Sequence, residues 1–582
     1  MTHDAWSPGG TTPGLPVLFL VDADRAALAA TESALARRFG ADYRVLTADS
    51  AEVGLAALEQ LAHHGDEVAL VAADLRLPGT DGIEFLGRAR ALHPGAGRAL
   101  LVAMDRRGTP IPFGDLSSLQ RATALGRIDF WTLKGSESPE ELLYPHVQEA
   151  LTAWTRANRP RHEVVRVVGE RWAPRSHALR DALARNSVPF AFFAADSEEG
   201  RRLLREHGVD ATRLPAVVFR DGTVLLDPIH AEVADALGVR IHPSPAVYDL
   251  AILGAGPAGL TAAVYGASEG LRTIVVEPEA VGGQAGTSSM IRNVPGFPRG
   301  VSGGELAFRA WEQTLLFGAE FVFSQRATGL SARGDERAIA LADGSEVVCR
   351  AAIIAVGVAY RRLGIPALER LVGAGVFYGA AGVEAPALAG EEVYVVGGAN
   401  SAGQAALHLA RFANRVTVLV RGGSLAGMSD YLVRQIGAAP NVEVRLRTRL
   451  VDGRGEDHLA GLTLAEVGTG RREEVPAAAV FVMIGSEART EWLPDAVVRD
   501  GRGFVLTDTD IPREAWSPAR PPLPFETGLP GVFAVGDVRH GAVNRVAGAV
   551  GEGSVAVGSV HQYLDEQTRV DATHTTKEGS VR

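Results

Sequence analysis

Two glycine-rich turns constrain the fold of this chain more than any other feature. Residues 252–259 read Ile-Leu-Gly-Ala-Gly-Pro-Ala-Gly, and residues 395–402 read Val-Val-Gly-Gly-Ala-Asn-Ser-Ala. Each turn follows a short β-branched run and opens an alanine-rich stretch that is typical of a helix. In this context glycines let the backbone approach a pyrophosphate at a helix N-terminus. The pair therefore predicts two dinucleotide sites, one for a flavin and one for a nicotinamide.

The bulk properties limit the partners of the chain. With 582 residues it is too long for one hydrophobic core, so we expect several domains. Its net charge of -11 gives no basic surface for a nucleic acid. We find neither a signal-peptide pattern in residues 1–14 nor an apolar run of membrane-spanning length, which predicts a cytoplasmic protein without a membrane partner. The single cysteine, Cys349, excludes an intrachain disulfide and lies in a strand-like run typical of a buried residue.

The alternation of strand-like and helical segments predicts an α/β fold throughout, divided into modules by polar and proline-rich linkers. We expect a doubly wound domain, a smaller α/β domain, a nucleotide domain interrupted by a second nucleotide domain, and a disordered tail. The predicted boundaries are, in that order, 1–155, 156–245, 246–366 with 487–565, 367–486 inserted between them, and 566–582.

Acidic residues follow two strand-like runs of the first module. Asp22 and Asp24 come after residues 17–21, and Asp74 comes after residues 68–72. The carboxyl ends of parallel strands meet at one edge of a sheet, where such folds place their ligand sites. Carboxylate oxygens there predict a site for Mg²⁺, with Asp22 and Asp24 as its ligands.

The segment 73–82, Ala-Asp-Leu-Arg-Leu-Pro-Gly-Thr-Asp-Gly, resembles the phosphoacceptor loop of response-regulator receiver domains. The resemblance implies Asp74 as the phosphorylated residue, Lys134 as its phosphate contact, and a histidine kinase as a phosphorelay partner. The chain departs from the family pattern, since Ala23 replaces one of the usual acidic pair and Val102 the switch hydroxyl. Two hypotheses stay open: phosphorylation at Asp74, or a degenerate receiver used only for docking or dimerisation.

The second module has a β-α-β-α-β-β order that resembles the thioredoxin and glutaredoxin fold, with Leu214-Pro215 at the family's cis-proline position. Where that family carries Cys-Pro-x-Cys, residues 173–176 read Ala-Pro-Arg-Ser. A thiolate is the attacking group in disulfide exchange, and a serine hydroxyl does not replace it. We therefore expect an adaptor that presents a surface to a partner or packs on the flavin module.

The residue after the next strand distinguishes the two nucleotide turns. After Gly254, Gly256 and Gly259, the strand 273–276 ends at Glu277, a carboxylate suited to ribose hydroxyls and therefore to the adenosine half of FAD. After the second turn, the strand 416–420 ends at Arg421, a cation suited to the 2′-phosphate of NADPH. Arg421 therefore favours NADPH as the second nucleotide, and NADH stays open as the alternative. The second turn contributes Gly397, Gly398, Asn400 and Ser401.

Further segments resemble the flavin-contacting parts of bacterial thioredoxin reductases. They are Gly-Gly-Gln at 282–284, Asn-Val-Pro-Gly-Phe-Pro at 293–298, Ala-Val-Gly at 355–357, Gly-Val-Phe-Ala-Val-Gly-Asp at 531–537 and Arg-Val-Ala at 545–547. The chain as a whole resembles fused response-regulator and thioredoxin-reductase-like flavoproteins of the pyridine nucleotide-disulfide oxidoreductase superfamily. The resemblance implies a homodimer and these flavin-binding residues: Gly282, Gln284, Asn293, Gly536, Asp537, Arg545, Val546 and Ala547.

The relay dithiol of that family is missing. Its Cys-x-x-Cys follows Gly-Val-x-Tyr, and residues 375–382 read Gly-Val-Phe-Tyr-Gly-Ala-Ala-Gly, with Gly379 and Gly382 at the cysteine positions. The resemblance thus implies an oxidoreductase that takes electrons from NADPH into FAD and passes them directly to an external acceptor, a small molecule or a redox protein. We expect the small glycines to leave room for it. The alternative is a non-catalytic redox or nucleotide sensor.

Overall fold

The computed structural model describes residues 15–103, 122, 127–134, 139–158, 164–186, 188–210, 212–288, 290–297, 300–379 and 384–578. The chain divides into two units, residues 1–162 and 163–582. The division falls at the polar segment 156–162, close to the predicted boundary between the first and second modules. No helix among the described residues combines the length and the apolar character that crossing a membrane requires.

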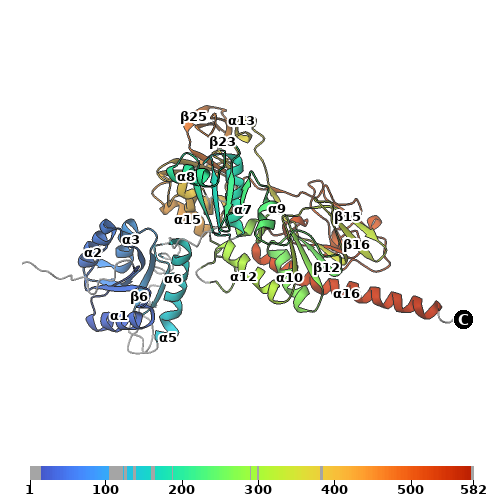
Figure 1. Ribbon diagram of the computed structural model, residues 1–582, viewed down its shortest axis with the longest axis horizontal. Coiled ribbons are helices and arrows are strands. Elements are labelled where there is room, and N and C mark those ends of the chain that lie inside the picture. Colours follow the sequence, from blue (N-terminus) through green and yellow to red (C-terminus); the bar gives the residue numbers. More distant parts are fainter. Residues whose placement is uncertain are drawn as a thin grey trace, which may run out of the picture. The chain divides into compact units, whose positions relative to one another are not determined.

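The first unit contains a parallel sheet in the doubly wound order β2-β1-β3-β6-β7 (Figure 1). Alternate residues of β1 pack on opposite faces: Phe19 with α2 and α3, and Leu18 with α1 and α6. Burial on both faces explains why β1 and β3 are continuous apolar runs. The elements are β1 (Val17–Val21), α1 (Arg25–Phe39), β2 (Arg44–Ala48), α2 (Ala51–His64), β3 (Val68–Asp74), β4 (Arg76–Leu77), β5 (Thr80–Asp81), α3 (Gly82–Leu92), β6 (Gly97–Val102), β7 (Phe130–Leu133), α5 (Pro139–Leu142) and α6 (Tyr144–Asn158).

The second module, residues 164–240, has a mixed sheet in the order β11-β10-β8-β9. Strands β8 and β9 are parallel, and β10 is antiparallel to both β8 and β11. The predicted element order is observed with one further helix, and the Leu214–Pro215 peptide bond is cis. The elements are β8 (Val165–Gly169), α7 (Pro174–Arg185), β9 (Phe190–Ala194), α8 (Glu198–Glu206), β10 (Ala216–Phe219), β11 (Val224–Leu226) and α9 (His230–Ala236).

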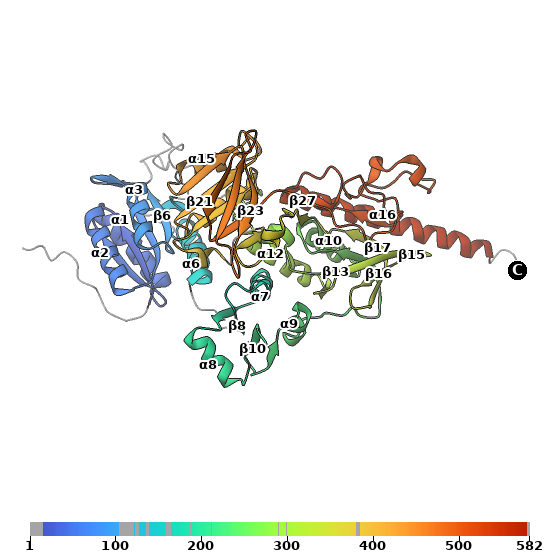
Figure 2. The same ribbon diagram turned by 90° about the horizontal axis from the view of Figure 1, so that it is seen from above.

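The outer nucleotide domain, residues 246–366 and 487–565, has a sheet in the order β14-β13-β12-β17-β16-β15, with β28 pairing with β17 (Figure 2). Helices α10, α12 and α16 pack on one face of its parallel part. A Cβ on Gly553 of α16 would lie 2.3 Å from the carbonyl oxygen of Ala258, so the close approach of α10 and α16 requires glycine there. The elements are β12 (Val247–Leu253), α10 (Pro257–Ser268), β13 (Thr273–Glu277), α11 (Gly283–Gly286), α12 (Gly303–Leu316), β14 (Glu320–Phe323), β15 (Ala327–Arg333), β16 (Glu336–Leu341), β17 (Glu346–Ile354), β28 (Val532–Ala534) and α16 (Val546–Glu578).

The inserted domain, residues 367–486, contains the parallel sheet β19-β26-β20-β21-β22 and the antiparallel sheet β23-β24-β25. The two segments that connect it to the outer domain pair with each other, as β18 (Ala359–Tyr360) and β27 (Ser486–Glu487). Its elements are α13 (Pro366–Glu369), β19 (Val376–Tyr378), β20 (Glu392–Val396), α14 (Asn400–Leu409), β21 (Arg415–Val420), α15 (Asp430–Ala438), β22 (Val442–Leu446), β23 (Thr448–Arg454), β24 (Gly461–Glu466), β25 (Arg472–Pro476) and β26 (Ala479–Val482).

Helix α16 extends past the predicted end of the outer domain at residue 565, to Glu578. The disorder expected for residues 566–582 stays a prediction, and residues 579–582 lie outside the described residues. Contacts hold the later turns of α16: Gln567 donates to the Tyr563 hydroxyl at 2.5 Å, and Arg350 of β17 donates to Thr568 at 3.5 Å. A polar helix segment that extends an already packed helix adds a backbone hydrogen bond for each residue fixed, which a polar composition alone does not reveal.

Candidate dinucleotide-binding sites

The first glycine turn connects β12 to α10 and is shaped by close packing. Gly254 has φ +108°, and a Cβ there would lie 2.4 Å from the carbonyl oxygen of Ala355. A Cβ on Gly259 would lie 1.9 Å from the carbonyl oxygen of Gly254. At Gly256, by contrast, a Cβ would meet no atom within 4 Å, and no side chain caps α10 at this N-cap residue. The turn therefore opens on free space at an uncapped helix N-terminus, which fits a pyrophosphate.

Glu277 ends β13 beside this turn and is only 6% exposed. Its carboxylate accepts hydrogen bonds from the backbone N–H groups of Ala255 at 2.6 Å, Glu279 at 2.8 Å and Ala280 at 3.0 Å. Burial raises the pKa of Glu277, and the three N–H donors oppose that effect. A carboxylate offers about four acceptor positions, so one stays available to a ribose hydroxyl. The predicted role of Glu277 fits this geometry.

The next segment carries Gly282 and Gln284. Gly282 has φ +92°, and a Cβ there would lie 2.5 Å from Cβ of Ala307, so this position also requires glycine. Gln284 donates its side-chain amide to the carbonyl oxygen of Val358, which ties the segment to the strand 359–360 that leads into the inserted domain. Asn293 is exposed.

Gly536 and Asp537 lie directly after β28, where the chain approaches the start of α16. The Gly536 N–H donates to Glu552 at 2.7 Å, and Arg539 donates to the same carboxylate at 2.6 Å. Asp537 is half-buried, and burial with the nearby Glu552 charge raises its pKa. Its carboxylate has no hydrogen bond to another residue that the structure describes, so it is free to accept one from a ligand hydroxyl. Arg545, Val546 and Ala547 form the junction into α16. The sequence did not predict the contact of Glu552 with Gly536, which the fold alone brings about.

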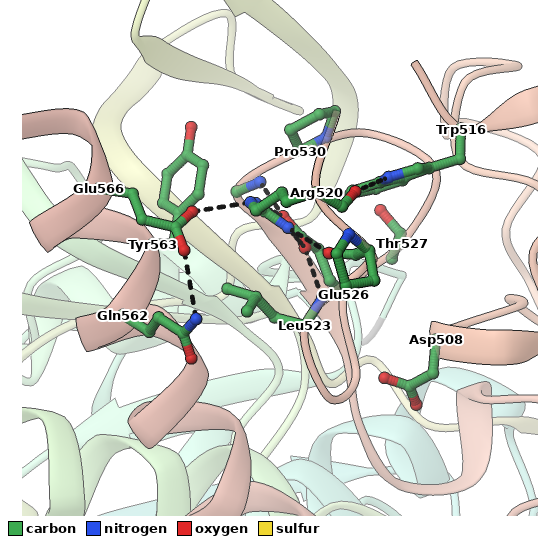
Figure 3. A network of polar contacts seen from close by, with 12 residues as sticks. Asp508, Trp516, Arg520, Leu523, Glu526, Thr527, Pro530, Gln562, Tyr563 and Glu566 are labelled. Carbon is green, nitrogen blue, oxygen red and sulfur yellow. Dashed lines mark hydrogen bonds and ion pairs between the residues drawn. The ribbon is translucent and has the colours of Figure 1, made fainter. Parts of the chain in front are cut away.

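A buried ion pair holds the segment before β28 against α16 (Figure 3). Glu526 is completely buried and receives two hydrogen bonds from Arg520, at 2.7 and 2.8 Å. The Glu526 carboxylate also accepts hydrogen bonds from the backbone N–H groups of Leu523 and Gly531. Arg520 also contacts Glu566 of α16 at 2.7 Å. This network lies directly before β28, the strand that leads to Gly536 and Asp537.

The second turn connects β20 to α14. A Cβ on Gly397 would lie 2.5 Å from the carbonyl oxygen of Met483, and one on Gly398 would lie 3.0 Å from the Val420 side chain. The Asn400 amide oxygen accepts from the backbone N–H of Ser429 at 2.7 Å, so Asn400 closes the turn against a neighbouring loop. Ser401 is exposed, and α14 has no side-chain cap. This turn also fits a pyrophosphate.

A second arginine lies beside Arg421 that sequence reasoning missed. In the parallel pair β21 and β22, Val420 is opposite Leu446, so Arg421 and Arg447 leave neighbouring strands at the same edge. Both are exposed, and neither side chain bonds to a described residue. The Arg447 N–H donates to the carbonyl oxygen of Gly422 at 2.9 Å, and its Nε lies 3.5 Å from the Cβ position of Gly423. The pairing register of β21 and β22 therefore places Arg421 and Arg447 next to each other.

In the first unit, Lys134 lies between two buried carboxylates. Its Nζ is 2.9 Å from Asp22 and 2.5 Å from Asp74. Burial opposes the Lys134 cation, but the hydrogen bonds to Asp74 and Asp22 outweigh it and raise the Lys134 pKa. Burial also raises the pKa of Asp22, although the Lys134 hydrogen bond lowers it. The structure thus brings Asp74 and Lys134 together as the sequence implied.

The structure does not support the predicted magnesium site at Asp22 and Asp24. Asp24 caps α1, accepting from the N–H groups of Ala26 at 3.0 Å and Ala27 at 3.2 Å. The ammonium of Lys134 contacts the carboxylate of Asp22. The described part of the chain contains no group of three or more His, Cys, Asp or Glu residues that could hold a metal ion. A helix-capping aspartate after a strand has the same sequence pattern as a metal ligand, so the pattern alone does not distinguish the two roles.

The region of the two glycines at 379 and 382 is described in part, because residues 380–383 lie outside the described residues. Gly379 has φ +102°, and a Cβ there would lie 2.7 Å from Cε2 of Tyr360. The Tyr360 ring therefore fills the space that we expected an acceptor to use at this glycine. Cys349, the one cysteine of the chain, is completely buried in β17, and burial raises its pKa to about 12. It has neither the access nor the ionisation of a reactive thiol.

Comparisons with known proteins place this arrangement in a family. The model of the pyridine nucleotide-disulphide oxidoreductase family matches residues 248–553. The chain is 33% identical to thioredoxin reductase of Treponema pallidum over 318 residues, which are 55% of this chain and 97% of that relative. It is 32% identical to thioredoxin reductase of Bacillus subtilis over 323 residues, 55% of this chain and 96% of that relative. The crystal structure of Lactococcus lactis thioredoxin reductase, 29% identical, superposes with a TM-score of 0.50 and covers 55% of this chain and 99% of that one. The chain, with its two dinucleotide turns in separate domains, belongs to the pyridine nucleotide-disulphide oxidoreductase family.

Proposed function

We propose that this protein is an FAD-dependent NADPH oxidoreductase that passes electrons to an external acceptor without an internal dithiol relay. One observation carries the proposal: no thiol of this chain is available as a relay. Cys349 is the one cysteine and is completely buried, and the Tyr360 ring lies against Gly379, where the family carries a cysteine.

In this function the protein binds the two cofactors and orients them relative to each other. Bound FAD and NADPH supply the two-electron chemistry. In the outer domain, the N-terminus of α10 would hold the FAD pyrophosphate, Glu277 a ribose hydroxyl and Asp537 a hydroxyl of the ribityl region. In the inserted domain, the N-terminus of α14 would hold the NADPH pyrophosphate and Arg421 the 2′-phosphate. The contrast between Glu277 and Arg421 supports a different nucleotide at each site.

The acceptor must approach the flavin from outside the chain. The second module offers no sulfur either, because Ser176 replaces the second cysteine of the thioredoxin-like turn and is completely buried. The chemistry leaves a quinone, a flavin, an iron-sulfur protein, a peroxide or a disulfide of another protein as acceptor classes.

Anaerobic stopped-flow reduction of the FAD-loaded protein tests the proposal. We expect the flavin absorbance to bleach with NADPH faster than with NADH, and to return when one class of acceptor is added. Protein that does not retain FAD, or a flavin that NADPH does not bleach, would contradict an oxidoreductase role. Bleaching without turnover on any acceptor of the panel would favour the second candidate, a redox or nucleotide sensor. A homodimer, expected from the resemblance, is measured by sedimentation on the same sample.

For the first unit we propose a receiver-like docking module that is not phosphorylated. The doubly wound strand order and the contact between Asp74 and Lys134 support a receiver-like site. The cap role of Asp24 and the alanine at position 23 support a loss of the second acidic ligand. Incubation with acetyl phosphate and Mg²⁺, followed by intact-mass measurement, should add no phosphate. An added phosphate that disappears in Asp74→Asn would establish the phosphorelay alternative and imply a histidine kinase.

A further inference from the structure

Helix α7 of the second module contacts both nucleotide domains. In its first turn, His177 Nδ1 lies 2.7 Å from Glu384 Oε1 of the inserted domain, and its ring lies 5.1 Å from that of Phe377. At its other end, Arg185 contacts Glu279 of the outer domain at 3.1 Å, and Asn186 donates to the Glu279 carbonyl oxygen at 3.0 Å. One helix thus contacts both domains, which are also connected through the strand pair β18–β27.

The contact with the inserted domain is closely packed. Gly373 has φ +84°, and a Cβ there would lie 2.9 Å from Cα of Pro174 and 3.4 Å from Cβ of His177. Glu384 is buried, and Trp172 packs against the apolar core of the inserted domain. The turn 173–176, which replaces a thiol motif, therefore lies at an internal interface.

The contact with the outer domain involves the loop that carries the ribose carboxylate. The Glu279 N–H donates to Glu277 at 2.8 Å, while the Glu279 side chain and carbonyl receive Arg185 and Asn186. Glu279 therefore connects the end of α7 directly to Glu277 in the first dinucleotide site.

In this arrangement the second dinucleotide site lies beside the flavin-contacting segment. Gln404 of α14, the helix that the second glycine turn opens, donates to the carbonyl oxygen of Met290 at 3.3 Å. Met290 lies between Gln284 and Asn293, the two predicted flavin contacts. In the domain orientation that α7 spans, the helix that follows the second glycine turn thus contacts the segment between Gln284 and Asn293.

We propose that the second module is a fixed bridge that acts through α7 to hold the two dinucleotide domains in the orientation used for electron transfer between their cofactors. The transfer part of this proposal rests on the proposed function, but the bridge itself does not. A fixed orientation raises the fraction of molecules in which the two rings are aligned, and alignment controls the rate of such a transfer. His177 and Arg185 act as positioning residues, because neither lies at a nucleotide turn.

Engineered cysteines test the bridge without any cofactor. The full-length variants His177→Cys/Glu384→Cys and Arg185→Cys/Glu279→Cys should each be cross-linked within one chain by a short bismaleimide, since the natural thiol is completely buried. The control pair is Arg202→Cys/Glu384→Cys. Arg202 lies on α8, which packs on the opposite face of the module's sheet from α7, so this pair should stay unlinked. Failure of both test pairs, or equal linking of the control, would overturn the bridge.

Flavin reduction tests what the bridge does. The cross-linked proteins should reduce FAD at least as fast as the same variants before linking. Glu384→Ala, which breaks the first contact, should slow reduction roughly tenfold at saturating NADPH while the Kd for NADPH is unchanged. Arg202→Gln should reduce FAD at the wild-type rate. Linked protein that no longer reduces FAD would overturn the proposed orientation. If the unmodified protein itself does not reduce FAD, the proposed function fails, and the cross-linking result still decides the bridge.

Discussion

The aromatic ring of Tyr360 lies against Gly379, so that a Cβ on this glycine would be 2.7 Å from Cε2 and 3.1 Å from Cζ of the ring. Position 379 also has φ +102°, a conformation that L-residues rarely adopt. Two separate obstacles therefore oppose a side chain at this position.

Gly379→Cys should destabilise the protein by about 2–4 kcal/mol, combining backbone strain with the clash, and should not create disulfide reductase activity. Gly390→Cys is the matched control, because Gly390 has φ +80° but a Cβ there meets no atom within 4 Å. Thermal unfolding of both variants separates strain from clash. Equal melting temperatures for the two would show that Tyr360 moves away at no cost.

Arg421 and Arg447 should share recognition of the 2′-phosphate. Replacing either by glutamine removes one charge-assisted contact worth about 1.5–3 kcal/mol, which weakens NADPH binding roughly tenfold or more. NADH, which lacks the phosphate, should bind each variant with unchanged affinity. Titration calorimetry measures both ligands, and Arg434→Gln, an exposed arginine paired with Asp430 on α15, controls for lost charge. If Arg447→Gln lost affinity for NADH and NADPH equally, Arg447 would have no role in recognising the 2′-phosphate.

Local sequence patterns predicted the parts of the fold that depend on neighbouring residues. The glycine turns, the Glu277 position and the insertion of one domain in another follow from short motifs and their order. Arg447 could not be found in this way, because its place beside Arg421 depends on the register of β21 and β22. The local pattern did not reveal that Asp24 caps α1, because a helix cap and a metal ligand have the same local pattern. The contacts of α7 join segments far apart in the chain, and no local pattern encodes them.

Cys349 should be inert until the protein unfolds. Burial raises its pKa to about 12, so at pH 8 fewer than about one molecule in 1,000 carries the thiolate, which is the form that reacts. A chromogenic disulfide reagent should detect no thiol in folded protein and one thiol in urea. Because the folded state holds this proton more tightly than the unfolded chain, the associated stabilisation is fully present below pH 9.0 and is lost as the pH rises toward 12. Rapid labelling of the folded protein at pH 8 would contradict this account.

The Arg520–Glu526 pair should matter far more than an exposed pair. Arg520→Met leaves the completely buried Glu526 carboxylate without its cation, a change that costs about 3–5 kcal/mol in buried pairs. Arg333→Met breaks the exposed pair with Glu346 and should cost less than about 1 kcal/mol. Thermal unfolding with FAD fluorescence as the readout follows the outer domain in both variants. A similar melting temperature for the two variants would show that the buried pair does not hold α16.

Glu277→Gln should weaken FAD binding. The carboxylate accepts three backbone N–H donors, and an amide can present only one oxygen, so at least one donor loses its acceptor and faces an NH₂ group instead. An unsatisfied buried donor costs about 1–3 kcal/mol, and the lost ribose contact adds to it. We expect the Kd for FAD to rise at least about tenfold, measured by quenching of free FAD fluorescence on titration with apoprotein. Glu346→Gln, a half-buried carboxylate in the same domain that is paired with the exposed Arg333, should leave the Kd unchanged. If Glu277→Gln binds FAD as tightly as the wild type, then Glu277 supports the turn alone and the ribose is held elsewhere.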